Sequence, residues 1–170
     1  MAATNTTALD PHAARRSLAT CMPDPAWWGG RPQGEALNGC ASGRAYTALC
    51  GAFRASGGLV CSEDLARLLA DYHLGEEHPP LADWLHSGAL FALPWQQRLW
   101  LPMFQVDLTD LRCRYDARQV RLELPAELDA WQVAAWFARP NGWLNDARPV
   151  DQLARNLPAV LNAARADRFV

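Results

Sequence analysis

The chain has 170 residues, of which 50% are hydrophobic, so it is long enough for one ordinary core or two small modules. Its formal net charge of −2 lacks the basic excess that is typical of a dedicated nucleic-acid binder. All 16 basic residues are arginine, which we attribute to codon bias rather than to phosphate recognition.

Cysteine and histidine patterns give no sign of a disulfide framework or a metal site. The 5 cysteines are an odd number without a C-x-x-C spacing, so we expect reduced thiols. His73, His78 and His86 match no metal-ligand spacing, and we expect no metal and no cofactor. No stretch approaches the ~18 apolar residues of a membrane span, so we expect a cytoplasmic chain that binds no membrane.

The amino-terminal part, residues 1–43, is rich in proline, glycine and small polar residues. Such a composition cannot offset the entropy of ordering, and it predicts a disordered arm. Trp27 and Trp28 form a candidate docking element within it, and the alternative is that they pack loosely against the folded part.

Residues 44–108 predict three helices and a hairpin. The first helix carries Tyr46, Leu49, Cys50 and Phe53 on one face, and Ser56-Gly57-Gly58 ends it. The second begins at Ser62, and apolar residues then recur at helical spacing up to Tyr72. A third starts at Pro79-Pro80 and stops at Gly88. Two strands, 89–93 and 98–101, follow with a tight loop between them.

Residues 109–170 predict a helical region after a loop at 107–114. Asp116 is a plausible cap for a helix through Val120 and Leu124. Asp129 and Gln132 have the spacing of a capping box, and Pro140-Asn141-Gly142 breaks the helix that they start. Two further helices are predicted at 149–153 and 158–169. The fold class is therefore α+β, mainly α.

Residues 58–108 resemble a winged helix-turn-helix of the excisionase and MerR type, because two helices precede a hairpin. The resemblance implies a recognition helix that enters the DNA major groove and a wing that contacts the backbone. The family places basic and small polar residues at the head of that helix, whereas this chain has Glu76, Glu77, His78, Pro79 and Pro80. Carboxylates repel phosphate, so DNA is only a secondary candidate ligand.

Residues 127–170 are similar to the toxin-binding domain of Xre/MbcA/ParS-type antitoxins, with an aromatic helix, a break before a Trp-Leu pair and a helix that begins at proline. The resemblance implies binding of a partner toxin, often of the RES type that consumes NAD, and self-association. The expected Xre-like amino-terminal domain is replaced by the winged module. The matching residues, and hence the predicted partner-binding set, are Trp136, Phe137, Asn141, Trp143, Leu144, Pro149, Val150 and Leu153.

The densest basic run is a second candidate surface, for nucleic acid or an acidic partner, although nearby carboxylates could balance it. It consists of Arg112, Arg114, Arg118 and Arg121, to which the hairpin adds Arg98.

The leading hypothesis is a non-enzymatic, antitoxin-like or regulatory protein with a disordered arm (1–43), a winged module (44–108) and a helical partner-binding domain (109–170). The alternative is a stand-alone interaction module that binds through the arm. No arrangement of nucleophile, base and orienting group supports an enzyme.

Overall fold

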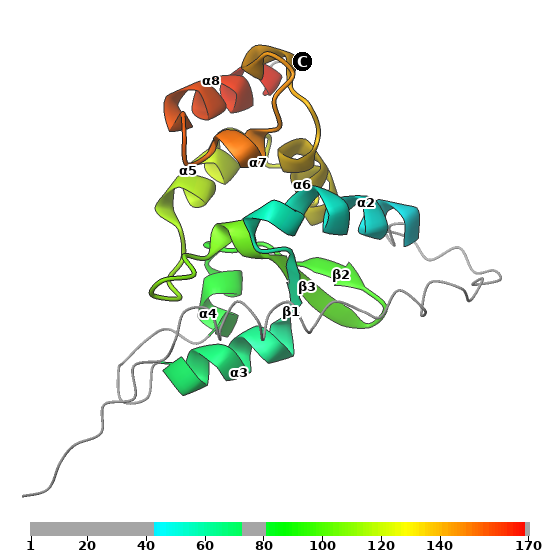
Figure 1. Ribbon diagram of the computed structural model, residues 1–170, viewed down its shortest axis with the longest axis vertical. Helices are drawn as coiled ribbons and strands as arrows, with labels where there is room; N and C mark the ends of the chain where they lie inside the picture. The colour runs from blue at the N-terminus through cyan, green and yellow to red at the C-terminus, as the bar shows by residue number, and fades with distance from the viewer. Residues whose placement is uncertain (1–42, 73–80, 169–170) are drawn as a thin grey trace, which may run out of the picture.

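The structure is a computed structural model that describes residues 43–72 and 81–168. The described part is α+β and mainly α, as the sequence predicts (Figure 1). Residues 1–42 of the predicted arm lie outside the described residues, as do Trp27, Trp28, His73, Glu76, Glu77, His78 and the proline pair, whereas Gly43, the last residue of the predicted arm, begins α2. The elements are, in chain order, α2 (Gly43–Phe53), η2 (Arg54–Ser56), β1 (Leu59–Cys61), α3 (Ser62–Tyr72), α4 (Leu81–His86), β2 (Leu93–Trp95), β3 (Arg98–Pro102), η3 (Met103–Gln105), α5 (Tyr115–Glu123), α6 (Ala130–Ala138), η4 (Gly142–Leu144), α7 (Pro149–Gln152) and α8 (Leu157–Asp167).

The predicted hairpin is present, but its first strand lies further along the chain than the sequence suggests. β2 and β3 are antiparallel, with Leu93 opposite Trp100 and Trp95 opposite Arg98. Gln96 and Gln97, with φ of 48° and 62°, form the two-residue turn, and positive φ at both positions matches the right-handed twist of the strands. Residues 89–92, which we had assigned to the first strand, precede it without strand pairing.

A third strand, β1, was not predicted. It pairs antiparallel with β3 and gives the strand order β1-β3-β2. Its three residues are all buried, so they lack the alternation of polar and apolar side chains that marks a half-exposed strand. The reason is that both faces of the sheet are covered.

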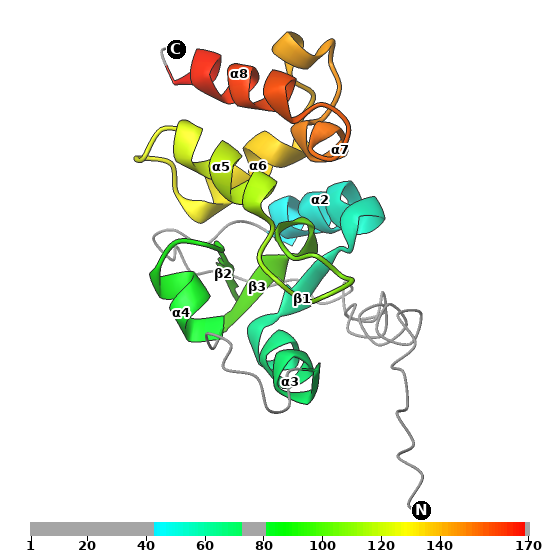
Figure 2. The same cartoon turned by 90° about the vertical axis from the view of Figure 1, so that its left-hand side faces the viewer.

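The two faces of the sheet belong to different hydrophobic clusters because successive side chains of a strand point to opposite sides. Leu59 and Cys61 face the cluster formed with α2 and the carboxyl-terminal helices, whereas Val60 faces the cluster formed with α3 and α4. The helices accordingly lie on both sides of the sheet, α3 and α4 on one and α2 and α6 on the other, with α8 stacked beyond (Figure 2).

The carboxyl-terminal helices begin close to the predicted positions. The capping box of Asp129 and Gln132 is confirmed, since each side chain accepts a hydrogen bond from the other residue's backbone N–H at 2.8 Å. The prediction for α5 was off by two residues: Arg114 rather than Asp116 is the cap residue, the helix begins at Tyr115, and Asp116 lies inside its first turn. α8 likewise begins at Leu157 rather than 158, because the side chain of Asn156 caps it.

The largest hydrophobic cluster crosses residue 108, the predicted boundary between the two modules. It joins Tyr46 and Trp100 of the first region to Val133 and Phe137 of the second. The ring centroids of Phe104 and Phe137 are 4.7 Å apart. The two predicted modules therefore share one core. No helix in the described ranges has the length and apolar character needed to cross a bilayer.

Candidate partner-binding groove

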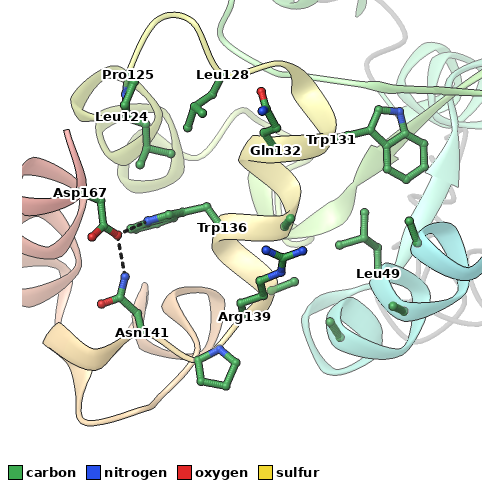
Figure 3. Close-up of a pocket in the computed structure, with 16 residues that line it drawn as sticks. Leu49, Leu124, Pro125, Leu128, Trp131, Gln132, Trp136, Arg139, Asn141 and Asp167 are labelled. Atoms are coloured by element: carbon green, nitrogen blue, oxygen red, sulfur yellow. Dashed lines mark hydrogen bonds between the residues drawn. The ribbon is translucent and has the colours of Figure 1, made fainter. Parts of the chain in front are cut away.

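A groove of about 770 Å³ lies over the outward face of α6, with α2 on one side and the loop before α6 and the last residue of α8 on the other (Figure 3). We call it the α2/α6 groove. Its surface is mostly apolar. One wall is formed by α2 and the other by the loop before α6 together with Asp167, and α6 forms the floor between them (Figure 3). The lining includes Ala48, Ala52, Leu128, Trp131, Ala135 and Trp136.

The α2 wall consists mainly of small side chains. Ala45, Ala48 and Ala52 recur at positions i, i+3 and i+7, and therefore share one face of the helix. The adjoining face of α2 carries the buried residues Tyr46, Leu49, Cys50 and Phe53, of which Leu49 also lines the groove. An alanine stripe beside a packed face leaves room for another backbone to approach closely.

Two tryptophans of α6 are the larger features of the groove, Trp131 on the side of α2 and Trp136 on the side of Asp167 (Figure 3). The indole N–H of Trp131 donates to the carbonyl of Pro94 at 3.3 Å, which connects the groove to the hairpin. Trp136 is partly buried, and its ring packs edge-on against Phe137 with centroids 5.1 Å apart. Both indoles are thus held in place on one side and present their remaining surface to the groove.

The groove ends at the carboxylate of Asp167. Its Oδ2 accepts hydrogen bonds from the indole N–H of Trp136 at 2.7 Å and from Nδ2 of Asn141 at 2.9 Å (Figure 3). Asn141 also caps η4, because its Oδ1 accepts from the backbone N–H of Trp143 at 2.9 Å. One hydrogen-bonded chain therefore connects the groove to the turn that carries Trp143.

Trp143 stands out as an exposed aromatic beside this site. Its exposed fraction is 68%, and it lines a second hollow of about 450 Å³ together with Gly142 and three residues that line both hollows, Pro140, Asn141 and Asp167. A tryptophan this exposed is costly in water and is a frequent anchor in protein interfaces.

The structure divides the predicted partner-binding residues into two groups. Trp143 is exposed and Trp136 partly exposed, and both lie at the grooves just described. The remaining six are buried. Asn141 caps η4 and also lines both hollows, whereas the other five pack in the interior: Phe137, Leu144, Pro149, Val150 and Leu153.

The residues of the predicted basic patch lie on β3, on the loop before α5 and on α5 itself. Arg98 lies on β3, and Arg112 is on the loop before α5, 3.7 Å from Asp110. Arg114 pairs with Asp116, its Nε donating to Oδ1 at 3.0 Å, and this bond raises the pKa of Arg114. Arg118 and Arg121 lie on α5.

Several residues of the site were missed by sequence reasoning. The alanine stripe of α2 was visible as a spacing, but an alanine face does not reveal what lies opposite. Asp167 and Arg139 gave no signal, since each is a single charge at a helix end. α2 and α6 become neighbours only in the folded chain, so their sequences alone do not reveal the groove.

The described cysteines are free thiols with raised pKa values. Burial raises the pKa of Cys50 and Cys61, and it raises that of Cys113 to about 11. In the described ranges no group of three His, Cys, Asp or Glu side chains could hold a metal ion. Comparison of the chain with protein-family models, with curated proteins and with solved structures finds no match.

Proposed function

We propose that this chain is a non-enzymatic, antitoxin-like protein that binds a protein partner through the α2/α6 groove and the adjoining Trp143. The observation that carries the proposal is the apolar groove that ends beside an aromatic side chain 68% exposed. Large exposed apolar surface on a single chain is typical of an interaction site. The resemblance of residues 127–170 to antitoxin toxin-binding domains gives the partner class, a toxin of the RES type.

The winged module has a structural role in this proposal. The order helix-strand-helix-helix-strand-strand, with β3 between β1 and β2, supports the winged-helix resemblance. Its first helix, α2, forms one wall of the groove. The module therefore builds the binding surface jointly with the carboxyl-terminal helices.

The charges on α3 and α4 speak against DNA as the ligand. In a winged helix these two helices would face the duplex, and here they expose Glu63, Asp71 and Asp83 against a single arginine, Arg67. Arg67 is 3.1 Å from Asp64, which offsets its charge further. Such a face would repel phosphate rather than release counterions.

The groove lining supports binding rather than catalysis. Its charged side chains are Arg139 and Asp167, and its other polar ones are Gln132 and Asn141. None of these residue types is an activated nucleophile with a base beside it. The groove therefore contributes shape and apolar contact to ligand binding.

The test uses the full-length chain as bait in lysate of the source cell, with quantitative mass spectrometry. Ala48→Trp fills the groove from α2, and Trp143→Ala removes the exposed anchor. Each is expected to lower recovery of the main partner at least about tenfold, as loss of a hot spot does. Ala66→Trp is the matched control, because Ala66 is exposed on α3, across the sheet from the groove.

The pattern of losses decides the outcome. A partner recovered equally by wild type, Ala48→Trp and Trp143→Ala would show that the groove is not the binding surface. If only Ala66→Trp lowers recovery of the partner, the interface lies on α3 and α4. Circular dichroism of each variant separates loss of binding from loss of folding.

A further inference from the structure

Asp167 is an unbalanced charge at the end of an apolar groove. It is the last residue of α8, where the carbonyl ends of the helix already place partial negative charge. A carboxylate is disfavoured at that position, whereas a cation is favoured. In residues 43–72 and 81–168 no arginine or histidine nitrogen lies within 4.0 Å of its oxygens.

The neighbouring arginines are directed elsewhere. Arg165, one half-turn earlier on α8, donates to Glu123 of α5 at 2.7 Å. This bond lowers the pKa of Glu123 and raises that of Arg165, so the two charges balance each other. The charge of Arg168 also acts on Glu123. Arg139 lines the groove, but it forms no ion pair with Asp167.

The two hydrogen bonds that Asp167 accepts come from neutral donors and reach the same atom, Oδ2. Among the described residues Oδ1 therefore has no donor. The donors Trp136 and Asn141 fix the carboxylate at the junction of the two hollows, because Asp167 lines both. A cationic group that enters from either hollow would meet a preoriented acceptor, and a charge-assisted bond is about twice as strong as a neutral one.

The walls of the groove indicate the shape of the occupant. α6 forms its floor and α2 one side, and the small side chains of Ala48, Ala52 and Ala135 line these two surfaces (Figure 3). Small residues on adjoining helices admit a third helix at close range. α2 has 11 residues, so a partner helix of about three turns, roughly 16 Å, would match its length.

We propose that the α2/α6 groove binds an apolar helical segment of the partner that carries an arginine or lysine, and that Asp167 binds this cation. The proposal rests on the proposed function, since it names the occupant of the same groove. Apolar contact with Trp131, Trp136 and the alanine stripe holds the helix, and the single ion pair fixes its direction and register. A segment with the opposite charge at that place is rejected.

The test begins with a random 14-residue peptide library displayed on phage and selected against the full-length chain. Peptides that bind wild type but not Ala48→Trp occupy the groove. We expect them to be rich in leucine and aromatic residues and enriched in arginine or lysine over the unselected library. Synthetic peptides from this class are then titrated by fluorescence or calorimetry.

Two charge-neutral substitutions measure the ion pair. Asp167→Asn keeps an oxygen that accepts from Trp136 and Asn141 but removes the charge, and citrulline in place of the peptide arginine does the same on the other side. Each is expected to weaken binding at least about tenfold, and both together no more than either alone. Asp71→Asn is the matched control, because Asp71 is exposed in the last turn of α3.

The outcomes separate the two proposals. Groove-dependent peptides without basic enrichment, or with equal affinity for wild type and Asp167→Asn, overturn the role of Asp167 and leave the groove as a binding site. If Arg139→Gln strengthens binding while Asp167→Asn has no effect, Arg139 already neutralises the carboxylate, and the proposal fails. If no selected peptide depends on Ala48, the groove is filled by this chain or by a second copy, and both proposals fall.

Discussion

The indole N–H of Trp136 donates to Asp167 at 2.7 Å, and this bond joins α6 to the carboxyl-terminal end of α8. Trp136→Phe removes the donor and keeps most of the ring. We expect the free energy of unfolding to fall by about 1 kcal/mol. Because the acceptor is charged, the loss could reach at most about 3 kcal/mol. Urea denaturation followed by circular dichroism measures the change.

The control for this prediction is Trp131→Phe. Trp131 donates to an uncharged acceptor, the carbonyl of Pro94, at the longer distance of 3.3 Å. Its loss should cost less than that of the Trp136 bond. Equal losses, or a larger one at Trp131, would mean that the carboxylate contributes nothing and that ring packing dominates at both positions.

Gly57 and Gly58 provide a matched pair of substitutions. Both have positive φ, 103° and 77°, but a Cβ on Gly57 would lie 2.7 Å from the Cβ of Met103, whereas Gly58 has open space. Gly58→Ala should cost about 1–2 kcal/mol through backbone strain alone. Gly57→Ala adds a steric overlap of about 1–3 kcal/mol, because Met103 is fully buried and cannot move aside. Similar midpoints in urea for the two variants would show that η3 shifts to relieve the overlap.

The sequence predicts the local structure of this chain better than the packing of its helices and strands against one another. Helix ends were found where a capping box or a glycine marks them, as at Asp129 and at Gly88 with φ of 67°, although the cap at Asn156 was missed. These signals act within four residues along the chain. A sequence alone therefore contains them in full.

Long-range pairing gave no such signal. β1 was missed because its three residues are buried on both faces, and a short apolar run between two helices has no period to detect. Gln105 is another example. Its side-chain amide accepts from the N–H of Phe91 at 2.9 Å and donates to two carbonyls, yet a lone glutamine looks like a surface residue.

The candidate site was predicted only in part for the same reason. Trp143 was identified from its position after a turn, and it is exposed. The wall formed by α2 comes from Gly43–Phe53, far earlier in the chain than Ala130–Ala138 of α6, and Asp167 acquires its place only through hydrogen bonds from Trp136 and Asn141. Sites assembled from distant segments require the fold.

The thiol of Cys113 should react slowly with alkylating reagents. Burial raises its pKa from 9.0 to about 11, and this outweighs the opposing effect of Arg118. The thiolate is the nucleophile, so at pH 8 the folded chain should contain about a hundredfold less of it than the unfolded chain. Because the folded pKa is the higher one, the thiol form stabilises the fold below pH 9, and this contribution is lost as the pH approaches 11.

Iodoacetamide modification with peptide mapping by mass spectrometry measures this rate. Modification of the same peptide in urea gives the rate for the unfolded chain. The ratio of the unfolded rate to the folded rate should decrease between pH 8 and pH 10. Modification at equal rates in both states would show that Cys113 is ionised in the fold, which would contradict the effect of burial.

Phe137 links the two predicted modules, because its ring lies 4.7 Å from Phe104 and 6.4 Å from Phe91. It is fully buried, so Phe137→Ala should lower the free energy of unfolding by about 3–5 kcal/mol. The loss should affect both modules at once, since one hydrophobic cluster spans them. Tryptophan fluorescence and far-ultraviolet circular dichroism should therefore report one shared midpoint, lowered equally by both probes.

The control is Leu99→Ala on β3, where the side chain is 40% exposed and little stability should be lost. Two separate transitions in the wild type, with Phe137→Ala shifting only one of them, would mean that residues 44–108 unfold independently of residues 109–170. In that case α2 could leave α6 without global unfolding, and the α2/α6 groove would open and close as the two modules separate. A single transition instead makes the groove a permanent feature of the folded chain, available to a partner without prior rearrangement.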